Sequence, residues 1–290
     1  MSNHSIDPKM TLGHVALTVS NLDRSLEFYR DVLGFQIRRH ADGVAQLGAG
    51  AQDLVVLHED PQAQRVRGTS GLYHFALLVP SRVELAKSLK RLVETQWPLQ
   101  GFADHLVSEA IYLPDPDGNG IELYRDRPRA DWPRLNGQIR MATDPLDVDG
   151  VLAELDGHDT EWRGLPPHTV LGHMHLQVGN LPQANAFYGD VIGLDLVTRF
   201  GNSALFMSAG GYHHHLGLNT WAGVGAPPQP PGSIGLRYFS LKLPQSQEVS
   251  AIVDRFRGAG GSIEETANGV LLRDPFHNGL VLTAQALGDQ

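Results

Sequence analysis

The octapeptide LGHVALTV at residues 12–19 returns as LGHMHLQV at residues 171–178, and this repetition decides how the chain is organised. The same offset of 159 residues relates DPDGNG at 115–120 to DPFHNG at 274–279. Self-similarity at a fixed spacing, without gaps over such a length, is the signature of a duplicated unit. The two halves of the chain are therefore duplicates of one another.

A weaker internal similarity lies inside the first half, where HVALTV at 14–19 resembles HFALLV at 74–79. Each half thus contains two modules, and each module reads as a strand, a helix and then several short strands. The sequence predicts an α+β fold of four βαβββ modules. We expect successive modules to pair within each half, forming a curved mixed sheet whose concave side can enclose a ligand.

Helix boundaries carry capping residues. Ser81 with Glu84 three residues later forms a capping box, and Asn21 is placed to cap the first helix. Pro182 suits the first turn of the third helix, and Gly258 suits the end of the fourth. These signals predict where each module passes from strand to helix.

The domain boundaries follow from the repeat. We expect an N-terminal domain over 8–128, a linker over 129–167 and a C-terminal domain over 168–290. The linker is rich in Pro, Asp and Arg and carries a short helical pattern, VDGVLAEL, at 148–155.

Composition excludes several classes of protein. With 290 residues, 41% hydrophobic and 19% charged, the chain is an ordinary globular protein long enough for two cores. The absence of cysteine excludes disulfides, thiolate metal sites and iron–sulfur clusters, so any metal must use His and carboxylate. A net charge of −9 without a Lys/Arg cluster argues against a nucleic-acid partner. Because no signal peptide or apolar run of about 20 residues is found, we expect a cytoplasmic protein without a membrane partner.

Two histidines and one glutamate stand out as candidate metal ligands. His14 and His74 occupy matching places on the first strands of modules one and two. Glu122 lies between Ile121 and Leu123, so it should point away from them, toward the concave side. A single strand histidine is more often structural than ligating, but two at equivalent positions with an inward glutamate favour a metal site. Two histidines and a carboxylate form the facial triad of non-heme Fe(II) oxygenases.

The second half departs from this pattern. His173 keeps the first ligand position, but Tyr238 stands where His74 would be and Val281 where Glu122 would be. With two of three ligands replaced, we expect the second half to bind no catalytic metal, despite its run of three histidines at 213–215.

The stretches at 12–35, 71–80 and 107–132 resemble the two-domain catechol 2,3-dioxygenases of the vicinal oxygen chelate superfamily, which includes the glyoxalases, bleomycin resistance proteins and extradiol dioxygenases. The resemblance implies two glyoxalase-like domains. It also implies Fe(II), and the same ligand types would accept Mn(II). Many larger extradiol enzymes carry the metal in the C-terminal half, but the matching residues of this chain lie in the N-terminal half, where we expect the metal. The implied iron ligands are His14, His74 and Glu122, and the implied groups near the substrate are His58, Tyr112 and, on looser spacing, His105.

The implied reaction is extradiol cleavage of a small aromatic diol by O₂, because three ligands leave room on the metal for both diol oxygens and dioxygen. Two alternatives stay open. A glyoxalase-like lyase or isomerase would need a fourth ligand, for which Glu59 is the nearest candidate. A metal-free binding protein that confers resistance would need no triad. Which diol is cleaved and whether the chain forms a homo-oligomer, as paired-module enzymes often do, are not fixed by the sequence.

Overall fold

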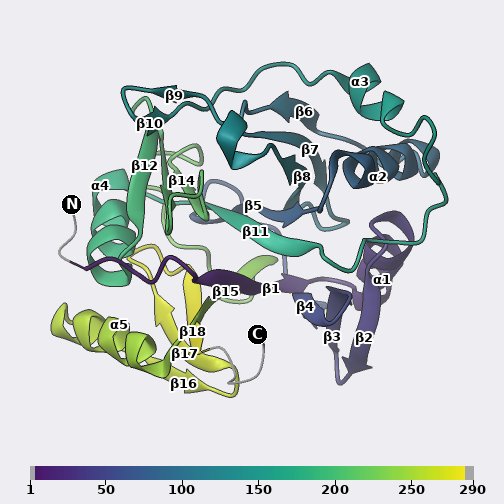
Figure 1. Ribbon diagram of the computed structural model, residues 1–290. Coiled ribbons are helices and arrows are strands. Elements are labelled where there is room, and N and C mark those ends of the chain that lie inside the picture. Colours follow the sequence, from purple (N-terminus) through teal and green to yellow (C-terminus); the bar gives the residue numbers. More distant parts are fainter. Residues whose placement is uncertain (1–3, 285–290) are drawn as a thin grey trace.

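Two eight-stranded mixed sheets dominate the computed structural model, which describes residues 4–284 (Figure 1). The first sheet has the spatial order β16 (Glu264–Thr266), β17 (Gly269–Arg273), β18 (Gly279–Ala284), β15 (Gly235–Leu243), β1 (Thr11–Val19), β4 (Gln52–Glu59), β3 (Val44–Ala49) and β2 (Gln36–Ala41). The second has the order β12 (Asp195–Phe200), β13 (Ala204–Ser208), β14 (Leu216–Asn219), β11 (Val170–Gln177), β5 (Gly71–Leu78), β8 (Gly120–Asp126), β7 (Ser108–Pro114) and β6 (Gly101–Asp104). The predicted α+β class with four βαβββ modules in two curved sheets is confirmed.

The pairing of the modules differs from the expectation. Module one, with β1 to β4, pairs with module four through β1 and β15, and module two, with β5 to β8, pairs with module three through β5 and β11. Each sheet therefore combines one module from each half of the chain. The segments 8–128 and 168–290 do not each close a sheet of their own, although their boundaries along the chain stay a prediction.

The registers explain why the repeat could not reveal this pairing. Val15 lies opposite Phe239 in one sheet, and Met174 lies opposite Phe75 in the other. The two junctions are thus built from equivalent residues. Pairing within a half or across the halves would bring the same kinds of strand together, so the pattern of apolar residues fits both.

The helices begin where the capping residues predict. The Asn21 side chain accepts a hydrogen bond from the Arg24 N–H, and that of Ser81 accepts one from the Glu84 N–H. The α-helices of the modules are α1 (Leu22–Glu27), α2 (Arg82–Glu94), α4 (Leu181–Asn185) and α5 (Ser246–Gly258), and π-helical turns over Phe28–Val32 and Ala186–Ile192 extend α1 and α4.

Helix packing joins the two sheets. The Arg91 Nε of α2 donates to the Asp31 carbonyl after α1 at 3.1 Å, and the Arg255 Nε of α5 donates to the Val191 carbonyl after α4 at 2.8 Å. One hydrophobic core spans both sheets and these helices. The two modules of each half consequently remain in contact through their helices although their strands lie in different sheets.

The linker runs over the second sheet. It contains a 3₁₀ turn (Arg129–Asp131), β9 (Arg134–Leu135), β10 (Gln138–Ile139) and α3 (Val148–Ala153), which confirms the predicted helical patch. Trp132 of this segment is buried against Tyr212 of module three.

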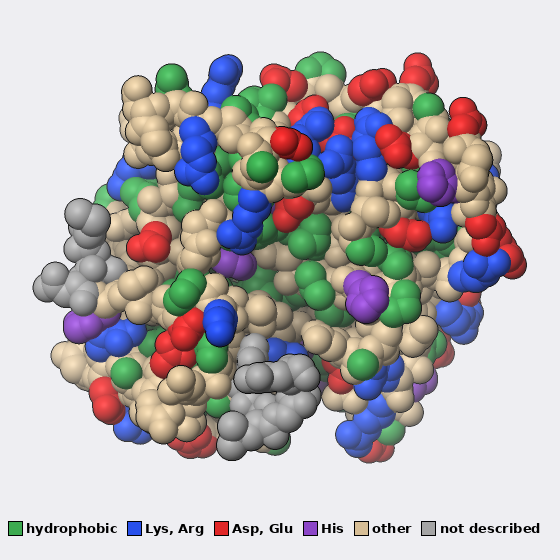
Figure 2. Space-filling model, in the orientation of Figure 1, with side chains coloured by type: hydrophobic (Ala, Val, Ile, Leu, Met, Phe, Trp, Pro, Cys, Tyr) green, Lys and Arg blue, Asp and Glu red, His purple; other side chains and the backbone are tan. Residues whose placement is uncertain are grey.

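On the face drawn in Figure 2, acidic and basic side chains are interspersed and form no continuous basic field. Within residues 4–284, no helix combines the length and the apolar character needed to cross a bilayer.

Candidate metal centre

Three neighbouring strands of the second sheet position the candidate ligands. His173 on β11 lies opposite Ala76 on β5, and Ala76 lies beside Glu122 on β8. The small alanine lets the side chains of His173 and Glu122 approach each other above it. His74, two residues before Ala76 on β5, faces the same side because side chains alternate along a strand. The neighbours Phe75 and Ile121 point the other way, into the core.

The three side chains converge tightly. Glu122 Oε2 lies 3.0 Å from His74 Nε2 and 3.0 Å from His173 Nε2, and the two histidine nitrogens are 3.4 Å apart. All three residues are buried, with exposed fractions of 6% for His74, 2% for Glu122 and 2% for His173. Within residues 4–284, this is the one group of His, Cys, Asp or Glu side chains with the geometry to hold a metal ion.

The electrostatics of the cluster suit a cation. Burial alone would raise the pKa of Glu122, but His173 and His74 hold it well below its usual range, so the carboxylate is charged. Burial lowers the pKa of His74, against the opposing effect of Glu122, which keeps the imidazole neutral. A charged carboxylate and a neutral imidazole are the protonation states that metal ligation requires.

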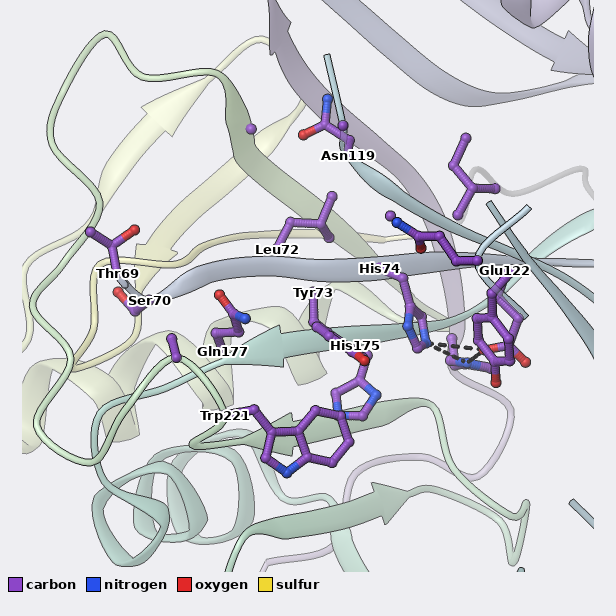
Figure 3. A pocket seen from close by; sticks show the side chains of 18 of the residues that line it. Thr69, Ser70, Leu72, Tyr73, His74, Asn119, Glu122, His175, Gln177 and Trp221 are labelled. Carbon is purple, nitrogen blue, oxygen red and sulfur yellow. Dashed lines mark hydrogen bonds and ion pairs between the residues drawn. The ribbon is translucent and has the colours of Figure 1, made fainter. Parts of the chain in front are cut away.

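The cluster lies in a cavity of about 980 Å³. Figure 3 shows His74 directed toward Glu122, with His175 between His74 and Trp221. Among the described residues, Glu122 is the one carboxylate in the wall of this cavity, which also contains Arg65, Arg67 and Arg199.

His105 and Tyr112 lie together in the same wall. His105 Nδ1 is 2.7 Å from the Ala142 carbonyl, which can only accept, so this nitrogen carries a proton. In the neutral ring, Nε2 is then an acceptor, and the Tyr112 hydroxyl donates to it at 2.7 Å. Burial, together with the charge of Glu122, raises the pKa of Tyr112 well above its ordinary value, so the phenol stays protonated.

The structure does not bring His14 to His74 and Glu122, which corrects the predicted ligand set. His14 is on β1 in the first sheet, where its Nε2 lies 3.4 Å from the Tyr238 hydroxyl. Its neighbours there are Tyr238 and Val281, the residues that replace the ligand types. His173 takes the place expected for His14, because module three and not module one adjoins module two.

Because module one lies in the first sheet, His58 and Glu59 also lie away from the cluster. His58 is on β4 in the first sheet, and within the described chain its buried Nε2 has no hydrogen-bond partner. The Glu59 carboxylate accepts from the Leu22 N–H at 2.9 Å and so supports the start of α1. His58 is therefore absent from the cavity wall, and Glu59 supplies no fourth ligand to the cluster.

Sequence reasoning missed several cavity residues. The Leu-Gly-His motif shared with His14 did mark His173 as keeping the first ligand position, but the expectation that the second half binds no catalytic metal excluded it from the ligand set, and this expectation is corrected here. His175 was overlooked although it shares the face of His173 on β11, and its buried Nε2 has no hydrogen-bond partner among residues 4–284. The aromatic side of the cavity, Tyr73 with Trp221, has rings 4.9 Å apart and left no recognisable pattern in the sequence.

Comparison with known families supports the duplicated architecture. The Glyoxalase/Bleomycin resistance protein/Dioxygenase superfamily matches residues 11–123 and again 170–282. A catechol-2,3-dioxygenase of Bacillus subtilis (strain 168) is 48% identical over 276 residues, which cover 93% of this chain and 96% of that protein. A lactoylglutathione lyase of Neisseria meningitidis is 29% identical over 127 residues, which cover 41% of this chain and 92% of that protein.

Solved structures resemble the chain in fold. A putative dioxygenase from Bacillus subtilis aligns with 98% of this chain and 87% of its own at a TM-score of 0.66 and 13% identity. Glyoxalase I from Zea mays aligns with 95% of this chain and 92% of its own at a TM-score of 0.59 and 17% identity. At these identities the likeness concerns the fold alone.

Proposed function

Because the chain belongs to the Glyoxalase/Bleomycin resistance protein/Dioxygenase superfamily, we propose that it is an extradiol dioxygenase that cleaves a small aromatic diol with O₂. Its metal is Fe(II), held by His74, Glu122 and His173. The observation that carries the proposal is the convergence of two imidazole nitrogens and one carboxylate oxygen in the wall of a large cavity.

The donor set fits the metal. Two imidazoles and a carboxylate on adjacent strands match the facial triad of non-heme Fe(II) oxygenases, and Mn(II) accepts the same donors. When bound, such an ion supplies open coordination positions for the diol and for O₂, whose two atoms both enter the ring-opened semialdehyde.

Tyr112 and His105 have a role in holding the substrate. Because the Tyr112 hydroxyl donates a hydrogen bond to His105 and keeps its proton, its oxygen lone pairs are left for a donor in the cavity. A diol hydroxyl is such a donor. The Ala142 carbonyl fixes the tautomer of His105, and this in turn fixes the direction of the Tyr112 O–H bond.

The charge of the cavity favours a diol that has lost a proton. Its described wall contains three arginines and, apart from the candidate ligand Glu122, no carboxylate. Positive charge near a cavity stabilises an anion inside it, and a diol is anionic after losing one hydroxyl proton. The arginines therefore favour the form of the diol that coordinates a metal.

The competing lyase or isomerase requires a different metal shell. Zinc or nickel in that chemistry takes a fourth protein ligand, commonly a second carboxylate. Within residues 4–284 the cavity wall contains one carboxylate, and the Glu59 side chain is engaged at α1. The open three-ligand arrangement therefore favours the dioxygenase.

The proposal is tested by adding catechol and a series of substituted catechols to the Fe(II)-loaded protein in air. We expect a yellow ring-fission product with consumption of one O₂ per diol. The Zn(II)-loaded protein and the Glu122→Gln variant are the controls and should give no colour. A colourless reaction with every diol, from protein shown to contain iron, would refute the dioxygenase.

A further inference from the structure

The loop between β13 and β14 contains two adjacent histidines that connect the cavity to Asp126 at the end of β8. His213 is fully buried, and its Nε2 lies 2.9 Å from Asp126 Oδ1. Its Nδ1 lies 2.8 Å from the Nδ1 of His214. His214 lines the cavity, with its ring centroid 4.1 Å from that of His173. Three residues thus form one chain of hydrogen bonds ending beside the candidate metal centre.

The surroundings of His213 keep this chain in place. The Tyr212 ring lies 4.0 Å from the His213 ring, and Trp132 of the linker lies 5.3 Å from it, measured between centroids. The Tyr212 hydroxyl is hydrogen-bonded to that of Tyr124 at 2.8 Å. Because aromatic rings enclose the imidazole, water does not compete for its two nitrogens, and both must be satisfied by Asp126 and His214.

When both rings are neutral, counting protons along the chain fixes the tautomer of each. The Asp126 carboxylate only accepts, so His213 Nε2 must carry a proton. In a neutral ring His213 Nδ1 is then a lone-pair acceptor, and the proton between the two Nδ1 atoms must belong to His214. His214 Nε2 is consequently left with its lone pair, and within residues 4–284 no side chain or backbone N–H donates to it.

We propose that Asp126 and His213 are positioning residues that hold His214 in its Nδ1–H tautomer, so that its Nε2 accepts a hydrogen bond from a hydroxyl group of the bound ligand. The site thereby selects a ligand that donates at this point over one that only accepts. A ligand that cannot donate a hydrogen bond to His214 Nε2 would leave this nitrogen unpaired in the complex, and this lowers the affinity for that ligand. The identity of the donor as the second diol hydroxyl, the one that does not donate to Tyr112, rests on the proposed function and applies to the diol before it loses a proton, whereas the tautomer is a property of the metal-free chain.

The tautomers can be read directly from the metal-free ¹⁵N-labelled protein at neutral pH. Long-range ¹H–¹⁵N spectra distinguish a protonated ring nitrogen from an unprotonated one, and the variants His213→Gln and His214→Gln assign the two signals. We expect His213 as Nε2–H and His214 as Nδ1–H. A His214 ring protonated at Nε2, or at both nitrogens, would overturn the proposal.

The variant Asp126→Asn tests whether Asp126 determines the tautomers of His213 and His214. Its amide can donate to His213 Nε2, which would move the His213 proton to Nδ1 and reverse His214 to Nε2–H. Asp131→Asn is the matched control, because the side chain of this exposed aspartate, five residues further on, has no hydrogen bond or ion pair within the described chain. Unchanged His214 signals in Asp126→Asn would show that Asp126 does not set the tautomer.

Kinetics of the Fe(II)-loaded enzyme give a second measure. We expect Asp126→Asn to lower kcat/KM for a diol by roughly 10- to 100-fold, the usual cost of losing an outer partner of a site residue, with iron content unchanged. Asp126→Glu, which restores a carboxylate, should recover part of the loss. An unchanged kcat/KM in Asp126→Asn would contradict the positioning role. Failure of every protein to cleave diols would refute the proposed function and leave the tautomer result standing.

Discussion

The two sheets contain four equivalent strand positions, which we call the two clefts, and three of the four carry different residues. In the second sheet the positions are His173, His74 and Glu122, and the small Ala76 lies between them. The same positions in the first sheet are His14, Tyr238 and Val281, with Ser240 in the place of Ala76.

Of these positions in the first sheet, the one at His14 keeps a residue type that can bind a metal, and His14 makes its hydrogen bonds with residues of the same sheet. The His14 N–H donates to Ser240 Oγ at 2.8 Å, and its ring meets the Tyr238 hydroxyl. The comparison teaches that a duplicated backbone preserves the place for a metal while the side chains decide whether it can be used.

The largest expected difference between the clefts concerns metal affinity. His173→Ala removes one of three candidate ligands and should weaken Fe(II) or Mn(II) binding by more than about 100-fold, beyond the cost of losing an outer partner. His14→Ala is the matched change in the first sheet and should leave the affinity unaltered. Titration of each metal-free variant checks this, and equal losses in both variants would remove the distinction between the clefts.

Rebuilding the lost ligands should give the first sheet a metal site. The variant Tyr238→His, Val281→Glu, Ser240→Ala restores the residue types found in the second sheet. We expect the variant to bind a second equivalent of metal, more weakly than the first by about tenfold or more because its outer partners are absent. Without metal, the buried carboxylate introduced by Val281→Glu should lower the free energy of unfolding by about 3 kcal/mol or more.

A metal-to-protein ratio measured after dialysis decides the outcome. A folded variant that still binds a single equivalent would show that equivalent backbone positions are not sufficient.

The tyrosines of the two clefts should differ in their effect on turnover. Tyr112→Phe removes the oxygen that we assign to the substrate and should lower kcat/KM by about 100-fold, within the range for loss of a proton-handling group. Tyr238→Phe, in the first sheet, should leave kcat/KM within about twofold, an effect no larger than that of an ordinary surface substitution. Steady-state kinetics on the iron-loaded variants measure both, and a similar loss in the two would contradict the assignment of the active cleft.

The smallest expected effect is the pH dependence contributed by His14. Burial lowers its pKa from 6.5 to about 4, while Asp53 opposes the shift. Between these pH values the unfolded chain binds a proton that the folded chain does not, so the free energy of unfolding falls as pH drops. His14→Gln should reduce this slope by about one proton, or roughly 1.4 kcal/mol per pH unit. Urea unfolding at about pH 4.5 to 7 measures it, and an identical slope in the variant would contradict a buried neutral His14.

Much of the fold was accessible from the sequence because its signals are local. The capping residues Asn21 and Ser81 lie where the helices begin, and the spacing of the repeat identified four modules. Alternation along the strand also predicted that Glu122 faces the concave side, and the match between modules selected His74. Tyr112 and His105, inferred from the resemblance, lie in the same cavity wall.

The third ligand candidate could not be chosen by such reasoning. His14 and His173 lie in equivalent motifs, and their strands meet equivalent partners, Phe239 and Phe75. Which of them adjoins His74 depends on which modules pair through their first strands, and an internal repeat does not determine this pairing. His213 and His214 were likewise hidden, because their roles depend on contacts with Asp126 and His173 from other parts of the chain.

The most direct test of this account is a crystal structure of the iron-loaded protein with anomalous scattering recorded at the iron edge. We predict one peak per chain, coordinated by His74, Glu122 and His173, and no peak beside His14. A peak at His14, or iron bound without His173, would contradict the assignment of the metal to the second sheet.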